Sequence, residues 1–446
     1  MTDIHAGNAS LKIKQLTRQN RSHWVCSAIA EQNAALSVAD RERKYAAMAE
    51  SPYRFFRGTS HLFWADLYKD WRFTFFGGTA ASQTWIQGDA HVYNFGAFAN
   101  HEGEVIYGLD DFDDAIVSDY QYDLWRLAIS VVLNAREHAR FDRAVIVKAL
   151  RHLAKGYLKT VTDRDAYEDP SAVHVTADTA SAPLKAFLEK TARKESRGKM
   201  LRKWTRVQKN GKRVFDGAHP KLKRLSPTQR KAFVQAFSAY QDALQAQRQP
   251  ACHFFRVKDV VRRERAGTGS LGTPRYYVLI EGEAEGEHDD IILDVKRQDG
   301  PAAHAAMSAE ERDTYHSVFA HEGERHASAF RALAEHPDQY LGWLQLEDGM
   351  YSVRERSPFK QDFPTDRLEA KKDVYRLARQ WGQILATEHC RAGRVLNEDA
   401  PSTFEQALRD RSAGREAAFI RLLAAIATHY ADCVTADHAR FCQGLC

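Results

Sequence analysis

Two segments decide how the rest of the chain is interpreted: GDAHVYNFG, Gly88 to Gly96, and DDFDDA, Asp110 to Ala115. Short strands are expected near 84–87 and 104–109, so the first segment forms a loop after one strand and the second ends the next. Mg²⁺ prefers hard oxygen ligands and is commonly held by one or two carboxylates or amides together with substrate phosphates. Two oxygen-rich loops at the ends of neighbouring strands therefore predict a magnesium-nucleotide site.

Each polar residue in these segments has an expected role. Asp89 would orient the attacking hydroxyl of an acceptor, while Asn94 and Asp111 would hold Mg²⁺ beside the phosphates of ATP. Asp113 is an alternative metal ligand, because the pattern does not single out one aspartate in this acidic run. Taken separately, the fragments also fit an acidic turn and an asparagine that caps the following backbone.

A glycine-rich segment, GTGSLG, follows much later in the chain between two strand patterns. Its glycines, Gly267, Gly269 and Gly272, would let backbone N–H groups approach phosphate oxygens closely. A hairpin that needs positive φ angles would use the same residues. The segment is therefore a candidate phosphate-covering loop and also a candidate turn.

Lys296 ends the apolar strand IILDV and is expected to bind phosphate, as the third-strand lysine of a kinase small lobe does. A helix expected from 308 to 334 would supply the acidic partner that fixes this ammonium group. Glu324 is the candidate for that partner, and Glu322 is the alternative. Either carboxylate also fits an ordinary solvated position on the helix surface.

The composition of the chain is that of a large globular protein: 446 residues, 44% of them hydrophobic. No uninterrupted apolar run of about eighteen residues occurs and the first residues lack the apolar core of a secretory signal, so a cytoplasmic protein without a membrane span is expected. The six cysteines are scattered without a CxxC pair, which favours reduced thiols. The segment 185–224 is rich in Lys and Arg and is either a solvated face or a surface for an acidic partner.

Changes in sequence texture predict four regions. A helical lead-in covers residues 1–50, and 51–248 would hold the catalytic and metal loops with a basic helical insertion. A β-rich unit with the glycine-rich loop is expected over 249–360. Helices over 361–446 would return to complete the larger unit.

The motifs resemble the catalytic and metal-binding loops of aminoglycoside-phosphotransferase-like kinases. In those proteins the motif HGDxxxxN precedes a strand that ends in DF(D/E), and a helix that begins with DL follows. The corresponding segments here are GDAHVYNF, LDDFDD and YDLWRL. Gln87 stands in place of the usual histidine. The small lobe of an ordinary kinase precedes the catalytic loop, whereas Lys296 follows it here. The resemblance therefore implies a circularly permuted, two-lobed protein-kinase-like α+β fold, with a mainly helical large lobe and a β-rich small lobe.

The order of motifs from SPYRFFRGTS to YSVRERSPFK also resembles a bacterial family of uncharacterised proteins, DUF 2252, over roughly residues 50 to 395. That family often reads NDFDE where this chain has DDFDD, and KEA where this chain has Lys296, Arg297 and Gln298. Arg57 belongs to the same pattern. Its guanidinium is suited to a phosphate and equally to backbone carbonyls.

The function expected from these observations is an ATP- and Mg²⁺-dependent phosphotransferase that acts on a hydroxyl of a small molecule or protein. Two alternatives stay open. One is a catalytically silent nucleotide-binding regulator, and the other is a nucleic-acid-binding protein that uses 185–224. Transfer of an adenylyl group would release pyrophosphate and is a further variant of the first reading.

Overall fold

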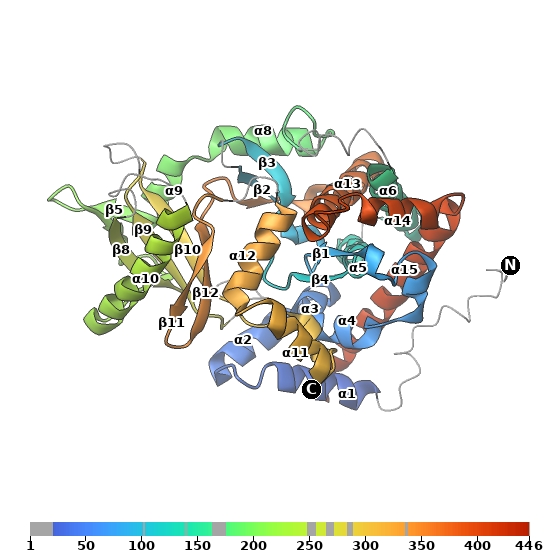
Figure 1. Ribbon diagram of the computed structural model, residues 1–446, viewed down its shortest axis with the longest axis horizontal. Helices are drawn as coiled ribbons and strands as arrows, with labels where there is room; N and C mark the ends of the chain where they lie inside the picture. The colour runs from blue at the N-terminus through green and yellow to red at the C-terminus, as the bar shows by residue number, and fades with distance from the viewer. Residues whose placement is uncertain are drawn as a thin grey trace.

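The chain forms a helical body and a six-stranded antiparallel sheet, with helix α12 (Glu322–Leu333) packed between them (Figure 1). The computed structural model describes residues 21–100, 103–138, 141–162, 175–247, 256–264, 272–282, 289–334 and 338–445. The mixed α+β class expected from the sequence is confirmed, with 57% helix and 16% strand.

The N-terminal lead-in is helical over its described residues, 21–50, as expected. It contains α1 (Arg21–Gln32) and α2 (Val38–Ala49), and α3 (Pro52–Gly58) and α4 (Ser60–Leu67) follow it. Ser51 caps α3 by accepting a hydrogen bond from the N–H of Arg54, and Pro52 occupies the first helical turn, where its missing N–H costs nothing. The Ser-Pro break in the sequence therefore marks the boundary between α2 and α3.

Two small antiparallel sheets carry the loops that contain the acidic motifs. One pairs β1 (Gln83–Ile86) with β4 (Ile116–Asp119), and the other has the order β13-β2-β3, with strands Gln361–Asp362, Phe95–Ala99 and Val105–Leu109. The two strands expected around the first motif exist, but they do not pair with each other. Strand β2 was not expected, because the aromatic and small residues of FGAFA directly follow the polar loop.

The larger sheet has the strand order β11-β12-β10-β9-β8-β7. Its strands are β7 (Leu222–Arg224), β8 (Val257–Arg263), β9 (Arg275–Ile280), β10 (Ile291–Arg297), β11 (Gly342–Leu346) and β12 (Gly349–Glu355). The expected strand pair around Asp348-Gly349 is the β11–β12 hairpin. The short strands β5 (Thr205–Val207), β6 (Arg213–Phe215) and β7 fall in a region where only helix was expected.

The two faces of this sheet pack against different helices. Along β9, Val278 and Ile280 lie in a cluster with Phe237 of α10 (Pro227–Gln247), whereas Tyr277 and Leu279 belong to a second cluster. That second cluster includes residues of α9 (Arg197–Trp204) and β6. The period-two alternation of the strand therefore buries both of its faces.

The single helix expected from 308 to 334 is wrong, because the chain breaks it in two. Helix α11 (Ala309–Val318) ends before Phe319, which is extended, and α12 starts after His321. The His321 side chain accepts a hydrogen bond from the N–H of Glu324, and the Glu324 carboxylate accepts one from the N–H of Ala320. These reciprocal bonds resemble a capping box, so a local N-cap stops the helical periodicity.

The helical body is built from long helices that share one apolar core. They are α5 (Gln121–Glu137), α6 (Arg143–Thr162), α8 (Leu184–Lys194), α13 (Lys371–Leu396), α14 (Thr403–Ser412) and α15 (Glu416–Arg440). Helices α6 and α13 approach closely, because a Cβ at Gly156 or Gly382 would meet the backbone of the other helix. A glycine in each helix permits this contact.

Two observations bear on the expected location of the protein. Within the described residues, one helical stretch, Glu416–Gly444, is long and apolar enough to cross a membrane, and 56% of its most apolar window is buried in the protein. Core helices of soluble proteins have the same character, so this stretch is weak evidence for a span.

Cys26 is disulfide-bonded, which corrects the expectation that all thiols are reduced.

Candidate phosphotransfer site

The two acidic loops and the end of β10 line one cavity of about 390 Å³. Residues of helices α2, α3 and α4 also line it. The residues around it include several that the sequence singled out: Asp89, Asn94, Asp111, Asp113, Lys296 and Arg57. Residues from distant parts of the chain therefore share one polar cleft.

The loop that carries Asp89 is fixed by Asp123 in the first turn of α5. The Asp123 carboxylate accepts hydrogen bonds from the backbone N–H groups of Gln87, at 2.6 Å, and Gly88, at 2.9 Å. Nε2 of His389 lies 3.3 Å from the same carboxylate. The buried Asp123 carboxylate therefore satisfies two backbone N–H groups of the turn, and these bonds fix the position of the Asp89 loop.

The Asp89 carboxylate contacts the guanidinium of Arg126, which is fully buried one turn after Asp123 on the same helix. Burial raises the pKa of Asp89 to about 7; Arg126 opposes this shift and the charge of Asp114 adds to it. A carboxyl group that titrates near neutral pH is suited to accept a proton from a hydroxyl.

The loop between β3 and β4 contains four aspartates, and three of them have a partner. These pairs are Asp110 with Lys360 Nζ at 2.7 Å, Asp113 with Lys296, and Asp114 with the backbone N–H of Ala302 at 2.6 Å. Among the described residues, none donates a hydrogen bond to the Asp111 carboxylate. Burial raises its pKa, but the charges of Lys296 and Lys360 more than offset this, so the pKa of Asp111 lies below its ordinary value.

Asn94 and Asp111 provide the oxygens that best fit a magnesium ion. The Asn94 amide donates to the backbone carbonyl of Asp89 at 3.1 Å, which leaves its side-chain oxygen without a donor among the described residues. The ionised Asp111 faces the same cavity. In the part of the chain that the structure describes, no three His, Cys, Asp or Glu side chains gather as a closed metal site. Such an open set suits Mg²⁺, which relies on phosphate and water oxygens for its remaining ligands.

Lys296 finds its acidic partner in the acidic loop. Its ammonium contacts the Asp113 carboxylate, whose other oxygen accepts a hydrogen bond of 3.0 Å from Gln298. Burial lowers the pKa of Lys296, and the negative charge of Asp111 counteracts this. The expected pairing with Glu324 is wrong, because that carboxylate caps its own helix. Asp113 is therefore occupied by the lysine, which leaves Asp111 as the better metal candidate.

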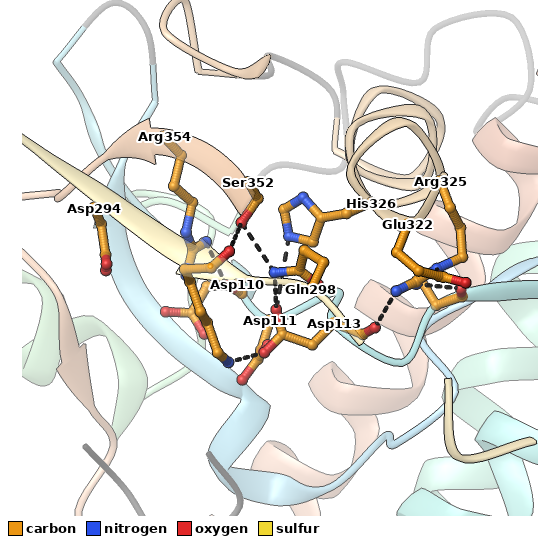
Figure 2. Close-up of polar contacts among 12 residues, drawn as sticks. Asp110, Asp111, Asp113, Asp294, Gln298, Glu322, Arg325, His326, Ser352 and Arg354 are labelled. Atoms are coloured by element: carbon orange, nitrogen blue, oxygen red, sulfur yellow. Dashed lines mark hydrogen bonds and ion pairs between the residues drawn. The ribbon is translucent and has the colours of Figure 1, made fainter. Parts of the chain in front are cut away.

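Helix α12 meets the acidic loop through Arg325 and His326 (Figure 2). Arg325 is fully buried and donates to the backbone carbonyls of Asp113, at 2.6 Å, and Ala115, at 2.7 Å, and to the carboxylate of Glu322 at 2.6 Å. Nε2 of His326 lies 3.8 Å from the Asp113 carboxylate. The helix thus holds the backbone of the loop, and its alternative acidic candidate, Glu322, binds Arg325 instead of Lys296.

The remaining candidates are placed as follows. Arg57 of α3 lines the cavity and donates from Nε to His91 Nε2 at 3.1 Å. Gly267 and Gly269 lie outside the described residues. Gly272 has a φ of +87°, and a Cβ there would meet Leu36. The structure therefore places only the end of the glycine-rich segment, next to the N-terminal helices.

Several residues of the site were missed by the sequence interpretation. Arg126 follows Asp123 by three positions on one helix, a spacing that puts both on the same face, so the pattern YDLWRL contained a signal for it. Lys360 ends the segment YSVRERSPFK, which contributes to the family resemblance, but no motif assigns a role to Lys360, Lys44 or Arg325. Their positions in the site depend on tertiary packing, which no local sequence pattern predicts.

Part of the positive charge of the basic segment 185–224 is paired with carboxylates of the protein itself. Arg197 pairs with Glu355 at 3.0 Å, and Arg224 pairs with Asp259 at 2.5 Å. Arg213 is buried beside Asp290. These arginines hold the insertion against the sheet, so fewer cations are free for an acidic partner than the sequence count indicates.

The fold and the cavity define a mixed α+β protein with an acidic, lysine-containing cleft between a helical body and a sheet. A family model for an uncharacterised protein conserved in bacteria, DUF 2252, matches residues 40–444. The chain belongs to this family. No curated protein and no solved structure matches the chain.

Proposed function

We propose that the protein is an ATP- and Mg²⁺-dependent phosphotransferase that acts on a hydroxyl group. The observation that carries this proposal is the meeting of Lys296, from the sheet, with the acidic loop and with Asp89 in one cavity. Phosphoryl transfer needs a cation on the phosphates, oxygen ligands for a metal and a carboxylate at the acceptor hydroxyl. The cavity has residues suited to each of these three roles.

The order of elements in the sheet supports a permuted kinase-like arrangement. In the chain, the glycine-rich segment lies between β8 and β9, Lys296 lies near the end of β10, the third strand counted from β8, and helices α11 and α12 follow before β11 and β12. A protein kinase places its glycine-rich loop, lysine and next helix in the same succession. Here the Asp89 loop comes before the β-rich lobe in the chain. The two lobes would therefore be connected in a different order from that of a kinase, with the same cleft between them.

The roles of the side chains follow from their positions. Asp89 accepts the proton of the acceptor hydroxyl while the acceptor oxygen bonds to the γ-phosphorus, the bond from that phosphorus to the bridging oxygen breaks, and ADP leaves. Lys296 and Lys360 neutralise phosphate charge. Asn94 and Asp111 would hold Mg²⁺, which, when bound, supplies further charge neutralisation.

A nucleotide-binding protein without turnover is the second candidate. The contact of Lys296 with Asp113 favours it, because the ammonium is already neutralised by a carboxylate. A bound phosphate would have to compete with that contact. Product analysis separates the candidates, since ADP indicates phosphoryl transfer, AMP with pyrophosphate indicates adenylyl transfer, and neither indicates a silent binder.

The test uses the full-length protein with labelled ATP, Mg²⁺ and a cell extract as the source of acceptors. We expect MgATP to raise the melting temperature and a labelled product to form. Asp111→Asn should remove metal-dependent turnover, Asp89→Asn should remove turnover and keep MgATP binding, and Lys296→Met should weaken binding. Full activity in Asp111→Asn, or no response of the wild type to MgATP, would reject the proposal.

A further inference from the structure

One wall of the cavity is built from the N-terminal helices and has no role in the scheme above. Lys44 of α2, Arg57 of α3 and the first residues of α4, Ser60 and His61, all line it. Neither helix α2 nor helix α4 belongs to the loops or strands that carry the phosphotransfer residues. This wall therefore needs its own explanation.

The cations of the cavity divide into two groups. Lys296 and Lys360 each contact a carboxylate of the acidic loop and act electrostatically on Asp111. Lys44 and Arg57, in contrast, form no ion pair with a carboxylate among the described residues. The charge of Asp114 acts on Lys44 and the charge of Arg57 acts on Asp89, but neither of these half-buried cations has a carboxylate within contact distance among the described residues.

Buried polar atoms without a hydrogen-bond partner occur on this wall and on the adjoining Asp89 loop. They are Ser60 Oγ, His61 Nε2, Gln87 Oε1 and His91 Nδ1, within the described residues. All four side chains line the cavity and are more than nine-tenths buried. Buried polar groups in folded proteins are nearly always satisfied, so atoms of this kind around a cavity mark the place of a polar ligand.

These atoms offer both donors and acceptors. Burial, together with the charges of Lys44 and Arg126, lowers the pKa of His61 to about 3, so its imidazole is neutral at physiological pH. A neutral imidazole and a serine hydroxyl can each donate or accept a hydrogen bond, and the Gln87 oxygen accepts one. This mixture matches hydroxyl groups, whereas Lys44 and Arg57, which form no ion pair among the described residues, match an anion.

We propose that Lys44, Arg57, Ser60 and His61 form the acceptor subsite, and that the acceptor is a small hydroxyl-bearing molecule with a phosphate or carboxylate group. This inference rests on the proposed function. The cations that form ion pairs with the acidic loop, Lys296 and Lys360, serve the nucleotide, so Lys44 and Arg57 are left for the charge of the acceptor. The cavity volume of about 390 Å³ suits a small molecule.

The first experiment measures binding of inorganic phosphate and of MgADP by calorimetry in the wild type and three variants. Lys44→Met should weaken phosphate binding about tenfold or more, the scale of one lost charge contact, and leave MgADP binding unchanged. Lys296→Met should do the reverse. Arg43→Met is the matched control, because Arg43 is exposed on the same helix. Lys44→Gln replaces Lys44→Met if the latter fails to fold.

The second experiment compares acceptors that differ in one group, ribose with ribose 5-phosphate and glycerol with glycerate, in transfer from labelled MgATP. We expect the anionic member of a pair to be preferred, and Lys44→Met to raise its KM while the KM for MgATP stays the same. Equal use of both members, or equal weakening of phosphate binding by the two lysine variants, would overturn the acceptor subsite and leave the phosphotransferase proposal standing. Loss of phosphate binding in Lys44→Met with no MgADP binding in the wild type would instead reject the phosphotransferase.

Discussion

Gly88 lies at the point where the Asp89 loop crosses the acidic loop, and its replacement by alanine tests that geometry. Its φ is +81°, and a Cβ there would overlap the backbone carbonyl of Asp114. The left-handed backbone alone costs a residue with a Cβ about 1–2 kcal/mol. A collision with a backbone that is held on both sides adds about 1–3 kcal/mol. We therefore expect Gly88→Ala to lose about 2–5 kcal/mol of stability in total.

Gly211→Ala is the control, because Gly211 has a φ of +79° and a Cβ there would meet no atom within 4 Å. It should lose only the backbone cost of about 1–2 kcal/mol. The assay is urea unfolding followed by tryptophan fluorescence and circular dichroism, with coincident transitions. Equal losses in the two variants would refute the close crossing of the loops. A larger loss in Gly88→Ala should be accompanied by weaker MgATP binding.

The remaining predictions concern the contacts of the cleft. Arg325→Met should cost about 3–5 kcal/mol in urea unfolding, because it leaves the buried carbonyls of Asp113 and Ala115 without a donor. Since the pKa of Asp89 is about 7 in the folded protein and its ordinary value is 3.8, the folded state binds more protons between these values and stability falls as pH rises through them. Asp89→Asn should flatten that fall in urea unfolding from pH 4 to pH 8. A double-mutant cycle of Lys296→Met and Asp113→Asn should give a coupling energy of about 1–3 kcal/mol.

Each of these has a contrary outcome. Arg331→Met, an exposed arginine on the same helix as Arg325, should lose much less, and similar losses would show that the Arg325 contacts contribute little. An unchanged pH slope in Asp89→Asn would mean that other buried carboxyl groups, such as Glu388 with a pKa of about 8, dominate the profile. Additive effects in the lysine cycle would mean that the two side chains do not interact.

The elements that the sequence identified are those with local signals. The periodicity after Asp123 and the turn at Asp348-Gly349 predict α5 and the β11–β12 hairpin, because hydrophobic spacing and turn residues act over a few positions. The interruption at Phe319 was missed although its cap, His321, is local, since histidine is not among the usual capping residues. Strand β2 was missed because its partner lies beyond a turn and its sequence is unremarkable for a strand.

The partner of Lys296 shows where sequence reasoning stops. The lysine was placed by its position at the end of an apolar strand, and its partner was sought on the next helix, where a kinase carries a glutamate. The choice between Glu324 and Asp113 depends on how a helix sits against a loop 183 positions away from the lysine. No pattern within a short window contains that information, so the pair emerges only from tertiary packing.

Asp113 in this position changes what helix α12 can control. In a kinase the helix supplies the carboxylate, so displacement of the helix breaks the lysine pair. Here the carboxylate is two positions from Asp111, so the partner of Lys296 and the proposed metal ligand share one short loop. Arg325 holds the backbone of that loop, so a movement of α12 would carry both groups together. The proposed phosphate and metal sites would then shift as a unit relative to Asp89, which is fixed separately by Asp123 and Arg126.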